Sequence, residues 1–271
     1  MPVVEEKPTL GRPRVHLRET GSTNDRAREL AGAGAPHGTL VTASAQNAGR
    51  GRQGRHWSAP AGSALLMSLL LRSPPPLLPL IAAVAVCDVA GEEALIKWPN
   101  DVAIARGSDA AGAHAGPMQV SSAHTNAKVV DPPGATVPPP TLAKLAGILI
   151  EGRPQAGWAV LGIGLNVAVR LEELPQELRR TAATLGCSPD AIEPTLARLL
   201  AALARRLDQP SAEILDAWRA RDALYGREIA WGSEGRGRAR GIDGMGHLIV
   251  ALDGGGRTTL DAGEVHLEPL A

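Results

Sequence analysis

The chain has 271 residues, 44% of them hydrophobic, which is enough for one sizeable core and a smaller second one. Its 28 Lys and Arg residues balance its 28 Asp and Glu residues, so a bulk polyanion such as genomic DNA is disfavoured as a partner, while a local basic patch stays open. Two isolated cysteines, an acidic N-terminus without an apolar core and apolar runs too short for a bilayer predict a cytoplasmic protein with no signal peptide and no membrane segment.

The first part of the chain alternates strand and helix signals. Capping residues at 22–25 precede an expected helix at 26–31, and a strongly apolar stretch at 80–90 predicts a buried helix. Strands are expected at 15–18, 40–45, 63–71, just before 97 and at 102–105.

Residues 106–140 differ in composition from their surroundings. They contain Gly, Ser, Ala and His, a run of three prolines and little apolar periodicity. Such a segment cannot bury enough surface to offset the entropy of ordering it, so we expect a flexible insertion between two strands of one domain.

Ordered signals resume after the insertion. Residues 144–151 and 158–167 read as apolar strands interrupted by glycines, which often mark the close approach of a ligand or another backbone. Helices are expected at 192–207 and 212–224, and short Gly-punctuated strands from Tyr225 onward indicate a small all-β barrel. The expected organisation is therefore a domain at 1–224 followed by a barrel at 225–271.

Residues 45–57 form the most informative segment, because three glycines and three arginines fall within seven consecutive positions, 49–55. Glycine lets the backbone approach a ligand closely, and arginine offers a permanently charged fork of donors for carboxylate or phosphate oxygens. The segment predicts a clamp for an anionic ligand, with Trp57 available to cover a flat ring. A disordered RNA-binding segment of the RGG type is the alternative, although the pattern does not repeat.

Five motifs occur in the order found in biotin protein ligases, a family that the chain resembles from about Val15 to its C-terminus. The motifs are Ser22-Thr23-Asn24, the Gly49 to Trp57 loop, Lys97-Trp98-Pro99-Asn100-Asp101, Lys144-Leu145-Ala146-Gly147-Ile148 and Gly162-Ile163-Gly164-Leu165-Asn166. The resemblance implies an α+β catalytic domain with a mixed β-sheet and flanking helices, related to class II aminoacyl-tRNA synthetases, followed by a small C-terminal SH3-like β-barrel. It also implies that biotin and ATP form biotinyl-5′-adenylate and that biotin then passes to a lysine of a biotin carboxyl carrier domain of an acyl-CoA carboxylase.

The chemistry requires two anions, a carboxylate and the α-phosphate, to come into contact. The main task is therefore charge neutralisation and alignment, and no protein nucleophile is needed. Lys144 matches the family's bridging lysine and is expected to be catalytic together with Arg52. For biotin we expect contacts from Ser22, Thr23, Asn24, Gln46, Gly49, Arg50, Gly51, Arg52, Lys144, Gly147 and Gly162.

For ATP the expected residues are Arg50, Arg52, Arg55, Trp57, Asn100, Asp101 and Asn166, with Trp57 against the adenine. Mg²⁺ is expected at the triphosphate end, with Asp101 as its ligand.

Several alternatives stay open. One alternative is a lipoate or octanoyl ligase of the same fold, which would favour an apolar pocket over polar groups for a ureido ring. Another is a biotin-binding module that does not catalyse a reaction. Only about twenty residues precede Ser22, too few for a winged helix, so no sequence-specific DNA binding is expected. Glu268 stands where the family often has a basic residue, and the family includes both monomers and homodimers.

Overall fold

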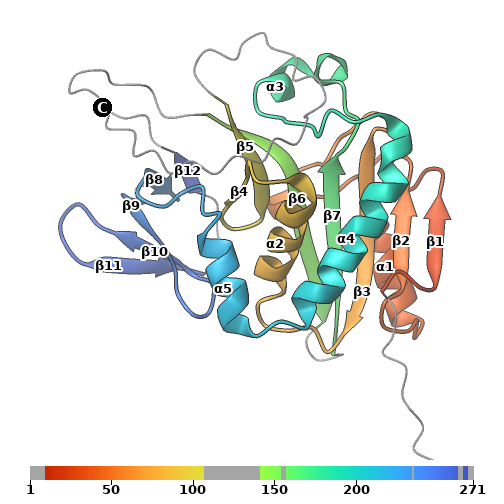
Figure 1. Ribbon diagram of the computed structural model, residues 1–271, viewed down its shortest axis with the longest axis horizontal. Coiled ribbons are helices and arrows are strands. Elements are labelled where there is room, and N and C mark those ends of the chain that lie inside the picture. The colour runs from red at the N-terminus through yellow and green to blue at the C-terminus, as the bar shows by residue number, and fades with distance from the viewer. Residues whose placement is uncertain (1–9, 107–140, 154–156, 234, 262–264, 268–271) are drawn as a thin grey trace, which may run out of the picture.

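A computed structural model describes residues 10–106, 141–153, 157–233, 235–261 and 265–267 (Figure 1). Among them, no helix combines the length and the apolar character that crossing a membrane requires. The insertion predicted at 106–140 lies outside the described residues except for Arg106, as does Glu268.

The larger of two sheets has seven strands in the order β1-β2-β3-β7-β6-β5-β4. β1 and β2 are parallel and every other neighbouring pair is antiparallel, so the sheet is mixed, as the resemblance implied. Its strands are β1 (Arg14–Leu17), β2 (Leu40–Ala43), β3 (Ala64–Arg72), β4 (Ala94–Lys97), β5 (Asp101–Arg106), β6 (Thr141–Arg153) and β7 (Trp158–Asn166).

Helices cover both faces of this sheet (Figure 1). α2 is buried along most of its length, packs against α4 and α5, and shares their hydrophobic core with alternate residues of β3 such as Leu65, Met67 and Leu69. α1 packs on the opposite face, beside β2, β3 and β7. The helices are α1 (Thr23–Gly32), α2 (Leu78–Ala90), the short α3 (Gln176–Arg179), α4 (Ile192–Leu207) and α5 (Ser211–Arg219).

The second sheet is antiparallel and follows the last helix, in the order β11-β10-β9-β8-β12. Its inward residues, among them Ile229 and Val250, belong to the same hydrophobic cluster as α2 and α5. Packing therefore joins the two sheets through one continuous core. The strands are β8 (Glu228–Trp231), β9 (Gly235–Ile242), β10 (Leu248–Ala251), β11 (Arg257–Leu260) and β12 (Val265–Leu267).

The structure explains why two helix boundaries, those of α5 and α1, differ from the expected ones. α5 ends at Arg219 rather than near 224, because residues 221–223 pair with the edge strand β4: Ile96 N donates to Arg221 O, and Ala223 N donates to Ile96 O. α1 begins at Thr23, and although Ser22 is its N-cap residue, no side-chain capping bond forms. The polar side chains at 23 and 24 lie within the helix and are used elsewhere.

Candidate active site

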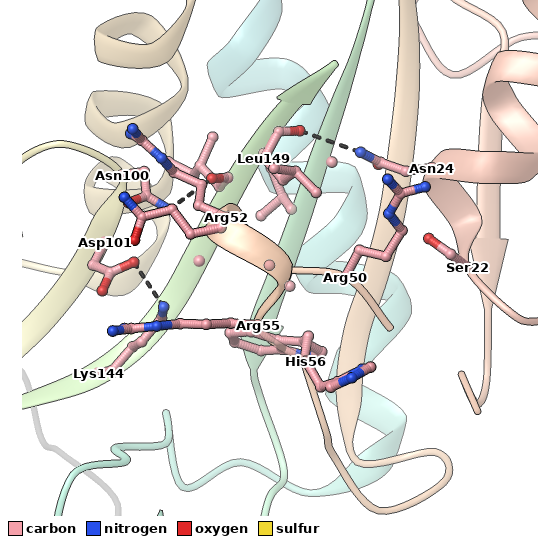
Figure 2. Close-up of a pocket in the computed structure, with 18 of the residues that line it drawn as sticks. Ser22, Asn24, Arg50, Arg52, Arg55, His56, Asn100, Asp101, Lys144 and Leu149 are labelled. Carbon is pink, nitrogen blue, oxygen red and sulfur yellow. Dashed lines mark hydrogen bonds and ion pairs between the residues drawn. The ribbon is translucent and has the colours of Figure 1, made fainter. Parts of the chain in front are cut away.

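A cleft with a cavity volume of about 140 Å³, partly open to solvent, lies on the α1 side of the large sheet (Figure 2). Its floor is made by β6 and β7, one wall by the start of α1, and another by the segment between β4 and β5. The predicted residues that line it are Ser22, Thr23, Asn24, Gln46, Arg50, Gly51, Arg52, Arg55, Trp57, Asn100, Asp101, Lys144, Gly147 and Gly162. The sites predicted from five separate motifs thus converge on one cleft.

Buried polar side chains form one end of the cleft. Gln46 Oε1 accepts hydrogen bonds from Thr23 N at 2.7 Å and Thr23 Oγ1 at 3.0 Å. Ser68 Oγ lies 2.8 Å from Thr23 Oγ1 and 2.6 Å from Asn24 Oδ1, and its one proton serves one of these two acceptors at a time. These bonds use the Gln46 carbonyl oxygen, and among the described residues nothing accepts from its amide nitrogen, which is left for a ligand.

Glycines on the sheet make room for this arrangement. A Cβ added to Gly162 would lie 2.2 Å from Asn24 Oδ1. Gly147 and Gly164 are cross-strand partners in β6 and β7, and a Cβ on either would meet the Trp57 ring, at 3.0 Å and 2.5 Å. The paired glycines form a flat platform on which the indole rests, so these positions serve the cleft rather than strand packing alone.

The Gly/Arg segment folds as a small hairpin over the cleft. Arg50 and His56 are bridged, Trp57 N donates to Gly49 O, and a 3-10 turn at Arg52–Gly54 forms the tip. Figure 2 shows Arg50 reaching toward Asn24 and Arg52 on the side of Asn100. The hairpin therefore presents its guanidinium groups to different parts of one cleft.

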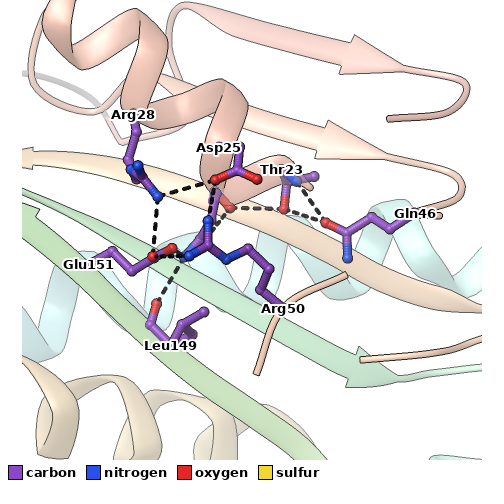
Figure 3. Close-up of polar contacts among 9 residues, drawn as sticks. Thr23, Asp25, Arg28, Gln46, Arg50, Leu149 and Glu151 are labelled. Atoms are coloured by element: carbon purple, nitrogen blue, oxygen red, sulfur yellow. Dashed lines mark hydrogen bonds and ion pairs between the residues drawn. The ribbon is translucent and has the colours of Figure 1, made fainter. Parts of the chain in front are cut away.

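Carboxylates hold the first of these arginines (Figure 3). Arg50 forms ion pairs with Asp25 on α1 and with Glu151 on β6, where Arg50 Nη2 lies 3.1 Å from Glu151 Oε1. Glu151 also accepts a bond from Asn24 Nδ2 at 2.8 Å. The hairpin is thereby connected to the polar end of the cleft.

Lys144 lies between the expected ATP residues. Its Nζ is 2.7 Å from Asp101 Oδ1 and 5.8 Å from the centroid of the Trp57 ring. Trp57 Nε1 is buried and donates no hydrogen bond to any of the described residues. An ammonium and an aromatic ring thus border one part of the cleft, and the buried indole nitrogen lies against Gly164.

The segment between β4 and β5 is fixed from two sides. Asn100 Nδ2 donates to Ile148 O at 2.9 Å, and Trp98 Nε1 donates to Gly246 O in the turn between β9 and β10 at 3.1 Å. Val265 of β12 also lines the cleft. The C-terminal sheet therefore contributes to the shape of the site.

Two predicted residues do not line the cleft. Asn166 is buried and donates from Nδ2 to Ala183 O at 2.8 Å, which ties the end of β7 to the chain at 183. Gly49 lies at the base of the hairpin, where an added Cβ would be 2.3 Å from Trp57 O. Both residues lie next to the cleft lining and are not part of it.

Sequence reasoning missed Ser68, Asp25, Arg28 and Glu151. Ser68 is the lone polar residue among the apolar residues 64–71 of β3, a signal that could have been used. Glu151 ends the apolar run that begins at Lys144, and Asp25 directly follows the first motif. Nothing local to Asp25 and Glu151 indicates that both pair with Arg50.

Comparison with known proteins agrees with this geometry. Residues 17–167 match the biotin/lipoate A/B protein ligase family. A biotin--[acetyl-CoA-carboxylase] ligase of Mycobacterium tuberculosis is 33% identical over 272 residues, covering 92% of this chain and 86% of the relative. The bifunctional ligase/repressor BirA of Bacillus subtilis is 34% identical over 188 residues, covering 65% of this chain, and the match spans about half the length of that relative, 47%.

Solved structures show the same fold. The biotin protein ligase of Aquifex aeolicus, in complex with biotin and ATP, superposes with a TM-score of 0.69 at 24% identity and covers 95% of this chain and 99% of its own. The family match over more than half of the chain and the identity to a relative along most of its length lead to one conclusion. The chain belongs to the biotin/lipoate A/B protein ligase family.

Proposed function

We propose that the protein activates biotin with ATP to biotinyl-5′-adenylate and transfers the biotinyl group to a lysine of a carrier domain. The observation that carries this proposal is the convergence of a buried amide and hydroxyl cluster, a lysine and an arginine hairpin on one cleft. The Mycobacterium tuberculosis relative is named for this reaction class, with acetyl-CoA carboxylase as its target.

The polar end of the cleft suits a ureido ring. Such a ring presents one carbonyl and two N–H groups, and each needs a partner once it is buried. Ser22, Thr23, Asn24 and Gln46 supply hydroxyl and amide groups there, all within the lining. The dithiolane of lipoate and the alkyl chain of an octanoyl group offer no ureido donors to this cluster, which favours biotin within the family.

The centre of the cleft suits the union of two anions. A biotin carboxylate oxygen attacks the α-phosphorus of ATP, the bond from that phosphorus to the oxygen bridging to the β-phosphate breaks, and pyrophosphate leaves. We assign Lys144 to the carboxylate and the α-phosphate together, and Arg52 and Arg55 to the phosphate oxygens. Their charges reduce the repulsion between the reactants as they approach.

Trp57 and the glycine platform suit the adenine. One indole face lies on Gly147 and Gly164, and the ring is thereby held at a fixed height above the sheet. Stacking on a held ring costs less entropy than stacking on a mobile one.

Mg²⁺ is proposed as part of the MgATP substrate. Asp101 is the one carboxylate among the described residues that line the cleft, and Mg²⁺ is commonly held by one or two carboxylates together with substrate phosphates. The described residues contain no cluster of three or more His, Cys, Asp or Glu side chains suited to a metal. The donor set therefore fits an ion that arrives with the nucleotide, whose charge would help to neutralise the phosphates.

In the second half-reaction the ε-amine of an acceptor lysine attacks the biotinyl carbonyl. The C–N bond forms, the bond to the AMP oxygen breaks, and the amine loses a proton. A carrier domain of an acyl-CoA carboxylase is the proposed acceptor, in the cytoplasm. We further propose that residues 1–224 form the catalytic domain and 225–271 an SH3-like barrel that closes one side of the cleft.

The test is a direct assay of both half-reactions. The protein is incubated with MgATP, labelled biotin and a purified carrier domain, with lipoate and octanoate in parallel reactions. We expect biotin-dependent exchange between ATP and pyrophosphate and label on the carrier lysine. If lipoate or octanoate supports the exchange and biotin does not, the protein is instead a lipoate or octanoyl ligase of the same family.

A further inference from the structure

Glu151 of β6 lies between Asn24, at the polar end of the cleft, and Arg50 of the hairpin. Its Oε2 accepts the bond from Asn24 Nδ2 at 2.8 Å, and its Oε1 lies 3.3 Å from Arg28 Nη1 and 3.1 Å from Arg50 Nη2 (Figure 3). It is also the most shielded member of this charged group, with 20% of its side chain exposed against 40% or more for Asp25, Arg28 and Arg50. One carboxylate thus touches both a residue of the polar end and the hairpin.

The first contact sets the orientation of the Asn24 amide. An ionised carboxylate only accepts hydrogen bonds, so the NH₂ group of Asn24 must face Glu151. The amide oxygen then faces Ser68 Oγ at 2.6 Å, above the position where Gly162 has no Cβ. Without the carboxylate, the remaining described partner of Asn24 Nδ2 is Leu149 O at 3.4 Å, a much weaker bond.

The second contact sets the position of the hairpin. Arg50 is held between Asp25 and Glu151, which lie on different elements, α1 and β6. Two anchors on separate elements restrict a long side chain far more than one exposed ion pair does. Because Arg50 and Arg52 are two residues apart, holding Arg50 also restricts where the tip of the hairpin can lie.

We propose that Glu151 is a positioning residue that couples the biotin end of the cleft to the arginine hairpin. It orients Asn24 for the ureido ring and docks Arg50 so that the hairpin closes over the adenylate. This inference rests on the proposed function. It adds a residue with two contacts, one of which affects biotin binding and the other the retention of the adenylate. The effect on Asn24 and the effect on Arg50 can be separated, because Glu151 and Asp25 each have a neutral replacement of nearly the same shape, Gln and Asn.

Three variants separate them. Glu151→Gln keeps an amide oxygen for Asn24 Nδ2 and removes the charge that holds Arg50. Asp25→Asn removes the charge of the other anchor of Arg50, which also pairs with Arg28 at 3.1 Å, and leaves the Glu151–Asn24 contact in place. Glu151→Ala removes both functions. Glu29→Gln is the matched control, because Glu29 lies on the same helix as Asp25 and pairs with Arg26, and neither residue lines the cleft.

Two measurements are made on each full-length variant, after circular dichroism has shown that it is folded. Biotin affinity is measured by calorimetry without ATP, and adenylate retention by the release of preformed labelled adenylate into a chase of unlabelled biotin and ATP. We expect Glu151→Gln and Asp25→Asn to release adenylate about tenfold faster than wild type with biotin affinity changed less than threefold. Glu151→Ala should also bind biotin about tenfold more weakly.

The inference is overturned if Glu151→Gln retains adenylate as well as Glu29→Gln does, or if Glu151→Ala binds biotin as tightly as Glu151→Gln. Should Glu151→Ala not fold, the comparison of Glu151→Gln and Asp25→Asn with Glu29→Gln still decides the hairpin half, and Asn24→Ala compared with wild type decides the biotin half. If the wild type itself neither binds biotin nor forms adenylate, the proposed function fails. If the wild type does both, and the variants match it in biotin affinity and adenylate retention, only the role of Glu151 is refuted.

Discussion

Gly164→Ala tests whether the glycine platform and Trp57 form the nucleotide site. The substitution adds a single methyl group to a buried strand that is paired on both sides. That methyl carbon would lie 2.5 Å from Trp57 Cε2, whereas ordinary contact begins at 3.4 Å. The indole must therefore retreat by about 0.9 Å (3.4 minus 2.5), since the strand beneath it cannot move.

The expected effect is on ATP more than on biotin or on folding. Overfilling a packed site costs about 1 to 3 kcal/mol, and the lower end applies here because Trp57 lies in a hairpin that can shift. About 1 kcal/mol corresponds to a fivefold change in an equilibrium constant, so the Kd for ATP should rise about fivefold. Biotin affinity should stay within twofold, because the polar end of the cleft is formed by other residues.

The assay is calorimetric titration of each variant with a non-hydrolysable ATP analogue and, separately, with biotin. Gly32→Ala is the control, because Gly32 has nothing within 4 Å of its added Cβ. The decisive comparison repeats Gly164→Ala in a Trp57→Ala background, where the obstructing ring is gone. If the methyl group weakens ATP binding there as much as it does beside the intact indole, the platform argument is refuted.

Three further predictions concern charge. Lys144→Met should lower biotin-dependent ATP–pyrophosphate exchange at least 100-fold while leaving the fold intact, since it removes the ammonium assigned to both reacting anions; near-normal exchange would free Lys144 of that role. Arg52→Gly should release activated biotin, so that bystander lysines in a protein mixture become labelled; labelling equal to wild type would contradict this. Burial raises the pKa of Asp222 from 3.8 to about 6. The folded state therefore binds more protons between these values, and the contribution of Asp222 to the free energy of unfolding is fully present below pH 3.8 and is lost, by about 3 kcal/mol, as the pH rises through about 6. Asp222→Asn should flatten that decline in urea unfolding measured at several pH values, and an unchanged pH profile would show that another group causes it.

Periodicity and turn residues were sufficient to predict most of the elements. The apolar strand expected at 63–71 and the helix expected at 192–207 were confirmed as β3 and α4, because burial on both faces of a strand or along one side of a helix restricts which residue types occur there. The end of α5 was not predictable in this way. Residues 221–223 leave the helix to pair with β4, about 125 positions earlier in the chain, and no local signal records that partner.

The candidate site shows the same division between local and distant information. Arginine, lysine and glycine motifs indicated the cleft because ligand chemistry restricts which residue types can serve there. Glu151, Ser68 and Asp25 escaped notice because their importance depends on which side chains they meet. Asn166 lies outside the cleft lining, where its amide donates to the carbonyl of Ala183, and its sequence position beside two site glycines does not distinguish this contact from a contact with a ligand.

The glycines of β6 and β7 connect these two kinds of information. Gly147, Gly162 and Gly164 could have been explained by strand packing, and only the structure shows that each missing Cβ leaves space for one particular side chain, Trp57 or Asn24. Both of those side chains belong to the predicted motifs. A large side chain from one motif therefore fits only because a strand of the sheet has a glycine opposite it. Substitutions of the side chain and of the glycine should have non-additive effects on ligand binding. This coupling is what the Gly164 and Trp57 double variant measures.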